Sequence, residues 1–103
     1  MVDRFIVGDV YFRVTYPGPA MKYPRIESFV FVGKNLSDED TEDIWYFQFA
    51  DSFAKHGSIL KSTGGDRRVS CLAKSELDDM LDDKGLLKEL NGARSRRLSD
   101  PSE

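Results

Sequence analysis

Apolar and polar residues alternate between positions 10 and 16, which is typical of a β-strand with one buried face. The more apolar side of this strand carries Val10, Phe12, Val14 and Tyr16. We expect that side to be buried and the side with Tyr11 and Arg13 to face away from the core. Proline cannot donate a hydrogen bond to a sheet, so Pro17 ends the strand.

Two more strands are predicted in the middle of the chain. Residues 26–32 are nearly all apolar, which favours a central strand covered on both faces. Residues 44–50 alternate again. One face of this third strand carries Trp45, Phe47 and Phe49, and the other carries Ile44, Tyr46, Gln48 and Ala50. The turn signal at 62–66 predicts a hairpin that joins residues 59–60 to 68–72.

The last third of the chain predicts helices. Ser75 is a suitable N-cap and is followed by acidic residues in the first turn, while Leu77 and Met80 begin an apolar stripe. A second short helix is expected at 86–90, ended by the Asn-Gly pair at 91–92. Strands first and helices last define an α+β fold. We expect an antiparallel sheet of about four to five strands, with one or two short C-terminal helices packed on one face.

Length and composition indicate one soluble domain. The chain has 103 residues and is 40% hydrophobic, so it can build one core, which we assign to residues 1–92. Residues 93–103 are polar, and we expect a disordered tail there. The net charge of -3 argues against a nucleic-acid partner, which requires a cationic surface. The start of the chain lacks the character of a signal peptide and no apolar stretch approaches the ~20 residues that cross a membrane, so we expect a cytoplasmic protein without membrane contact.

An acidic run followed by aromatic residues is the most informative part of the chain. Its carboxylates are those of Asp38, Glu39, Asp40, Glu42 and Asp43. Trp45 and Tyr46 follow directly, and these two residue types dominate protein-binding interfaces. Two interpretations stay open: a solvated loop that keeps an apolar sheet soluble, or a surface that attracts a basic protein. Calcium is a third option, because carboxylate oxygens are its ligands, but the run lacks the spacing of an EF-hand loop.

The remaining reactive side chains do not form a recognisable catalytic or metal-binding motif. His56 and Cys71 are the only histidine and cysteine, so they cannot make a disulfide or a zinc site by themselves. Cys71 shares a strand face with Val69, and we expect it to be buried and unreactive. The aspartates between 78 and 83 are interpreted as a solvated helix face. We therefore assign no catalytic residue, no metal ligand and no cofactor.

These observations favour a small non-enzymatic binding or accessory protein, for example one with an inhibitor or immunity-like role. Its expected partner is a basic protein or a second copy of the chain. The site would consist of the five carboxylates together with Trp45 and Tyr46. One alternative is a small-molecule site with weak enzymatic activity between sheet and helices, which would use Tyr11, Arg13, His56, Arg67 and Arg68. The other is a purely structural homodimer.

Overall fold

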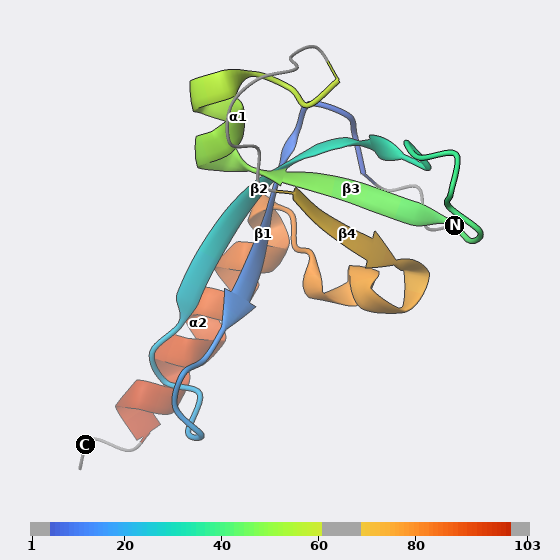
Figure 1. The fold of residues 1–103 in the computed structure, drawn as a ribbon. Helices are drawn as coiled ribbons and strands as arrows, with labels where there is room; N and C mark the ends of the chain where they lie inside the picture. Colours follow the sequence, from blue (N-terminus) through green and yellow to red (C-terminus); the bar gives the residue numbers. More distant parts are fainter. Residues whose placement is uncertain (1–4, 61–68, 100–103) are drawn as a thin grey trace.

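A single antiparallel sheet organises the molecule (Figure 1). The computed structural model describes residues 5–60 and 69–99. The strands are β1 (Val10–Thr15), β2 (Arg25–Lys34), β3 (Ile44–Phe49) and β4 (Val69–Ala73). They lie side by side in chain order, β1-β2-β3-β4, and each pairs antiparallel with its neighbour. With the helices, this confirms the predicted α+β class.

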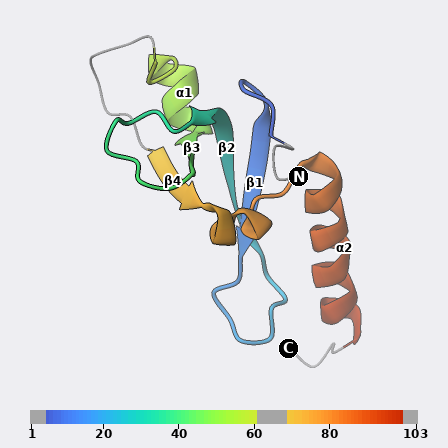
Figure 2. The same cartoon turned by 90° about the vertical axis from the view of Figure 1, so that its right-hand side faces the viewer.

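Helices lie on both sides of this sheet, as Figure 2 shows for α1 and α2. They are α1 (Ala50–His56), the 3-10 helix η1 (Lys74–Asp79) and α2 (Asp83–Ser99). The short helix α1 follows β3 directly and is capped at its C-terminus by Gly57, whose φ of 78° suits glycine. Within the described ranges, no helix has both the length and the apolar character that crossing a membrane requires.

The core lies on the sheet face that η1 covers. Its buried members are Phe5, Tyr11, Phe29, Phe31, Trp45, Phe47, Leu72, Leu77 and Met80. Phe47 sits among other rings, with centroid distances of 5.2 Å to Phe5 and 5.1 Å to Phe31. Such edge-to-face and tilted ring pairs add to the stabilisation from burial alone. Leu77 and Met80 are buried, as the apolar stripe predicts.

The buried face of β1 is the opposite of the one that the sequence predicts. Tyr11 is 4% exposed and packs edge-on against Phe5 at 4.9 Å, whereas Val10 is 40% exposed. The register explains this difference: Tyr11 lies opposite Phe29, on the same face as the aromatic core. The Tyr11 hydroxyl accepts a hydrogen bond from the Ile6 amide at 2.7 Å, so burial leaves its oxygen satisfied.

The C-terminal helix is longer than the sequence predicts. The Asp82 carboxylate caps its start by accepting the Gly85 amide at 2.8 Å. The helix then continues through Gly92 to Ser99, so the predicted helix end at 91–92 is wrong and the predicted boundary of the tail falls inside α2. Residues 100–103 lie outside the described residues, as does the predicted turn at 62–66.

Contacts with the β1–β2 connection explain why α2 continues beyond Gly92. Ala93 is fully buried just after it, and Arg97 donates to the Lys22 carbonyl at 2.7 Å. Arg96 donates to the Tyr16 hydroxyl at 2.9 Å, and that hydroxyl donates to Glu89. Glycine costs a helix about 1 kcal/mol relative to alanine, which several tertiary contacts outweigh.

Candidate functional site

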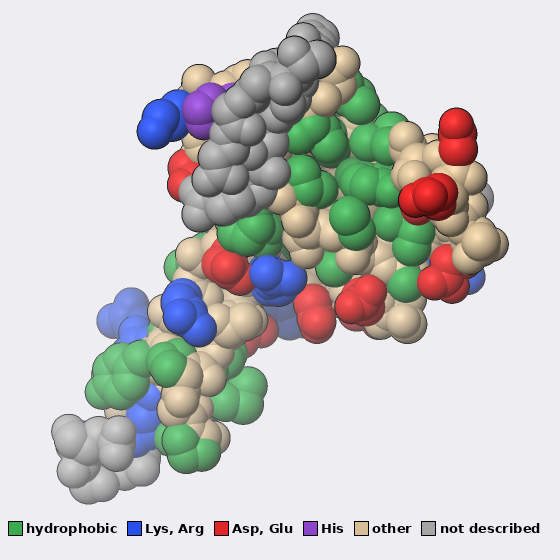
Figure 3. Space-filling view, in the orientation of Figure 1, with side chains coloured by type: hydrophobic (Ala, Val, Ile, Leu, Met, Phe, Trp, Pro, Cys, Tyr) green, Lys and Arg blue, Asp and Glu red, His purple; other side chains and the backbone are tan. Residues whose placement is uncertain are grey.

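Part of the sheet face opposite the core remains accessible beside the turn that joins β2 to β3. We call this surface the tyrosine face; it comprises Leu36, Ile44, Tyr46, Cys71 and Ala73. The register places Tyr46 between Gly33 of β2 and Cys71 of β4. Figure 3 shows hydrophobic side chains gathered over this part of the molecule, with acidic side chains along the right-hand rim.

A glycine lets the turn fold back onto this face. Leu36, which is 39% exposed, packs directly over Gly33. A Cβ atom on Gly33 would lie 2.9 Å from the Leu36 Cδ2 atom, and the φ of 151° is one that other residues rarely adopt. Gly33 therefore permits the close approach that places Leu36 beside Tyr46.

The acidic turn, residues 35–43, is attached to the tyrosine face through Asp40. The Tyr46 hydroxyl lies 2.9 Å from Asp40 Oδ2 and 3.1 Å from Oδ1, and it donates to this carboxylate. The Ser37 amide donates to Asp40 Oδ2 at 3.2 Å. The hydrogen bond to Asp40 raises the pKa of Tyr46 to about 12, because the carboxylate stabilises the protonated phenol.

A second attachment holds the other end of the turn. Asn35 Nδ2 donates to Asp43 Oδ1 at 3.0 Å, and the Asn35 Oδ1 atom accepts the Ile44 amide at 2.8 Å. Lys34 Nζ lies 3.3 Å from Asp43 Oδ2. The hydrogen bond from Asn35, followed by that from Lys34, lowers the pKa of Asp43. Both ends of the acidic turn are thus fixed by side-chain contacts.

The structure separates the five predicted carboxylates into two groups. Asp40 and Asp43 hold the turn in place. The side chains of Asp38, Glu39 and Glu42 are exposed, and they have no ion-pair partner among the residues that the structure describes. These three charges are the ones available to a partner.

The sequence predicts that Trp45 contacts a partner, but in the structure this residue is buried. Its side chain is 1% exposed, because the alternation along β3 directs it into the core with Phe47. Lys34 Nζ lies 4.8 Å from the centre of the Trp45 ring and contributes a cation–π contact. Of the two predicted aromatic contacts, only the half-buried Tyr46 lies on the accessible face.

The prediction that Cys71 is buried is also wrong. It is exposed, because its partner across the strands is Tyr46 and both belong to the face opposite the core. Partial burial and then the charge of Asp40 raise the pKa of the Cys71 thiol, which disfavours the reactive thiolate.

The residues of the predicted small-molecule site do not converge on one cavity. Arg13 pairs with Glu27 at 3.0 Å, Tyr11 belongs to the core, and His56 ends α1. Arg67 and Arg68 lie outside the described residues. Across residues 5–60 and 69–99, no three His, Cys, Asp or Glu side chains are grouped to hold a metal ion.

Gln48 has a structural role that the sequence did not predict: it is fully buried on the face opposite the core. Its amide group donates to Ser52 Oγ at 3.2 Å and to the Gly57 carbonyl at 3.0 Å, and it accepts the Ile59 amide at 3.0 Å. These bonds attach α1 and the following loop to β3. The only signal in the sequence was a polar residue within an aromatic strand.

Comparisons of the chain with models of protein families, with curated proteins and with solved structures found no match. The features of the molecule that bear on function are the tyrosine face and the acidic turn. Together they define the class of site: an apolar surface of modest size beside a turn that is held in place and carries exposed carboxylates.

Proposed function

We propose that this chain is a small non-enzymatic binding protein whose tyrosine face and acidic turn dock onto a basic patch of another protein. The observation that carries the proposal is the bond between Tyr46 and Asp40, which joins the two parts. Because of it, the acidic turn holds a defined position beside an apolar surface. An inhibitor or immunity-like role, in which the chain covers a basic enzyme, fits this arrangement.

Charge supports a basic partner. Asp38, Glu39 and Glu42 project from the turn without a described counter-charge. Unpaired charges on one rim raise the rate of encounter with an oppositely charged surface. Since the chain as a whole also carries a net charge of -3, the field around the rim is not cancelled by an excess of basic residues.

The same charges argue against a second copy of the chain on this face. A two-fold interface places the same patch of both copies together. Each copy would then bring its own acidic turn to the interface without supplying a basic surface for the other, and like charges at an interface cost free energy. A heterologous basic partner carries no such cost.

Tyr46 is the residue that we expect to contribute most contact. It is half-buried before binding, and its hydroxyl is held by Asp40, so little side-chain freedom remains to be lost. Tyrosine is enriched among the residues that dominate interface energetics. Leu36, which is 39% exposed, adds apolar surface next to it.

The test starts with affinity capture from an extract of the source cells, followed by purification of the captured protein. Capture alone does not support the proposal. Binding of the purified pair is then compared for the wild-type chain, Glu39→Gln with Glu42→Gln, and Tyr46→Ala. We expect the charge variant to lower the association rate about 10-fold at low salt, and Tyr46→Ala to raise the dissociation rate.

A matched control removes the same number of charges elsewhere. Asp78→Asn with Asp79→Asn changes two exposed carboxylates of η1, which packs against the other face of the sheet. This variant should bind as the wild-type chain does. The proposal would be overturned if the two double variants lowered the association rate equally. A salt-independent association rate or the absence of any captured protein would also overturn it.

A further inference from the structure

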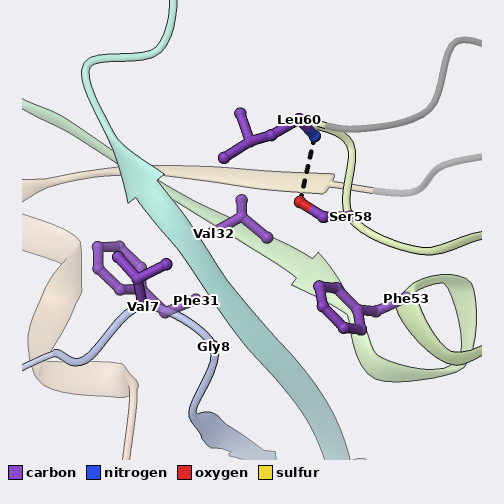
Figure 4. Close-up of a pocket in the computed structure, with 7 residues that line it drawn as sticks. All are labelled: Val7, Gly8, Phe31, Val32, Phe53, Ser58 and Leu60. Carbon is purple, nitrogen blue, oxygen red and sulfur yellow. Dashed lines mark hydrogen bonds between the residues drawn. The ribbon is translucent and has the colours of Figure 1, made fainter.

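A cavity of about 210 Å³ lies between the turn before β1, strand β2, and the segment that contains α1 (Figure 4). Its apolar lining comes from Val7, Phe31, Val32, Phe53 and Leu60, with Ser58 as its polar member. Figure 4 shows Phe31 and Phe53 at opposite sides, with Val32 between them. None of the five residues of the tyrosine face lines this cavity.

We propose that this cavity binds a small neutral aromatic molecule that carries one hydrogen-bond acceptor. The proposal goes beyond the docking function above and does not depend on it. Three properties of the lining lead to this ligand class: its size, its lack of charge and the position of one hydroxyl group.

The size of the cavity suits a ligand of about one ring. An engineered apolar cavity of about 150 Å³ in another protein binds benzene, and sites for drug-sized ligands begin at about 300 Å³. The volume of about 210 Å³ lies between these values. It accommodates a benzene ring with a substituent of two or three heavy atoms.

The described lining favours a neutral ligand over a charged one. No charged side chain is among the described residues that line the cavity, so an ion would lose hydration without gaining a counter-charge. An aromatic ring instead gains contact with the rings of Phe31 and Phe53. These contacts favour a flat apolar molecule over a sugar or a nucleotide.

Ser58 supplies the one directional contact. Its Oγ atom accepts the Leu60 amide at 3.1 Å. The hydroxyl proton has no acceptor among the described residues, so it is available to donate to a ligand oxygen. A carbonyl or ether oxygen on the ring substituent would satisfy it, which sets the orientation of the ligand.

Two neighbouring residues provide a matched pair of variants. Val7 and Ile6 are each 64% exposed, but only Val7 lines the cavity. Val7→Phe therefore extends a larger side chain into the space from its rim, while Ile6→Phe makes a similar change outside it. Neither position belongs to the buried core, so both variants should fold.

In the experiment, the full chain is titrated separately with acetophenone, ethylbenzene and benzoate. Two-dimensional NMR of the backbone amides monitors each titration. We expect acetophenone to shift the amides of Val32, Phe53 and Ser58 in a saturable manner. Val7→Phe should weaken this binding at least about 10-fold, and Ile6→Phe should change it less than about twofold.

Ser58→Ala separates the hydroxyl contact from the apolar ones. One neutral hydrogen bond corresponds to a factor of about 3 to 10 in affinity. Acetophenone should therefore bind more tightly than ethylbenzene to the wild-type chain, and this preference should disappear in Ser58→Ala. Benzoate should bind neither protein.

Several results would overturn the proposal. They are the absence of saturable shifts up to the solubility limit of acetophenone, unchanged binding to Val7→Phe, and binding of benzoate as tight as that of acetophenone. Shifts at Tyr46 and Cys71 without shifts at Val32 would place the ligand on the tyrosine face instead, and would also reject this cavity.

Discussion

The two faces of β3 carry similar aromatic residues but differ in how far those residues are exposed. Trp45 and Phe47 point into the core and have almost no exposed surface. Tyr46 lies between them in the sequence, yet it remains half-exposed beside the acidic turn. The direction of a side chain in the strand, and not its aromatic character, therefore decides whether it stabilises the fold or is available for binding.

The largest expected difference between the two faces is in stability. Trp45→Ala removes a buried ring from the core and should lower the free energy of unfolding by about 3–5 kcal/mol. Tyr46→Ala, one position along, should cost clearly less because Tyr46 is already partly exposed. Urea unfolding monitored by circular dichroism measures both variants. Equal losses would show that the two faces are packed alike.

The buried Gln48 gives the next largest effect. Gln48→Leu keeps most of the side-chain volume but leaves the Ile59 amide and the Gly57 carbonyl without their described partner. An unsatisfied buried group costs about 1–3 kcal/mol, and the loss should fall mainly on α1 and the loop that follows it. Hydrogen exchange of amides 52–59 measures this local opening.

Ser52→Ala is the control for Gln48, because it removes only one of the three hydrogen bonds of the Gln48 side chain. Its effect on exchange should be the smaller of the two. If Gln48→Leu left the exchange rates of α1 unchanged, then the apolar contacts of the α1 helix, rather than this network, would hold it to the sheet.

The strand faces also show what the sequence can predict and what it cannot. Alternation along β3 identified Trp45 and Phe47 as one face, and strands followed by helices predicted the α+β class. The same alternation along β1 led to the wrong buried face, because Val10 and Tyr11 are both apolar enough to be buried and only pairing with Phe29 decides between them. Register between distant strands is not a local property of the sequence.

The candidate site was predicted only in part, because its contacts are also not a local property of the sequence. Composition drew attention to the acidic run and to Tyr46. It did not distinguish Asp40, which bonds to Tyr46, from Glu39 and Glu42, which remain unpaired in the described structure. The end of α2 was missed because Arg96 and Arg97 bind to a connection about 75 residues earlier in the chain.

The ionisation of Tyr46 can be followed by spectroscopy. Its pKa is raised to about 12 by Asp40, so this phenol should ionise well above the ordinary value of about 10. Asp40→Asn should lower the pKa of Tyr46 towards 10, and Tyr46→Phe identifies the signal. Ultraviolet titration near pH 10–12 measures this change.

The raised pKa of Tyr46 also has a consequence for stability. Below pH 10 the phenol is protonated in both folded and unfolded chains, so the stabilisation is fully present. As the pH rises towards 12, only the unfolded chain ionises readily and the free energy of unfolding falls. Tyr46→Phe should lose less stability over this interval. Parallel curves for both proteins would contradict the bond to Asp40.

The smallest expected effect concerns Asp43, at the other attachment of the acidic turn. Asn35 and then Lys34 lower its pKa, so its carboxylate stabilises the fold above the unfolded pKa near 4, and the effect is lost as the pH falls through the lower folded value. Asp43→Asn should therefore differ from the wild-type chain in urea midpoint at pH 6 and converge with it at pH 2. Glu42→Gln, which removes one exposed carboxylate of the same turn without removing a described hydrogen bond, is the control for the loss of a single negative charge. If the two variants behaved alike, the turn would be held by Asp40 alone, and the available charges would include Asp43.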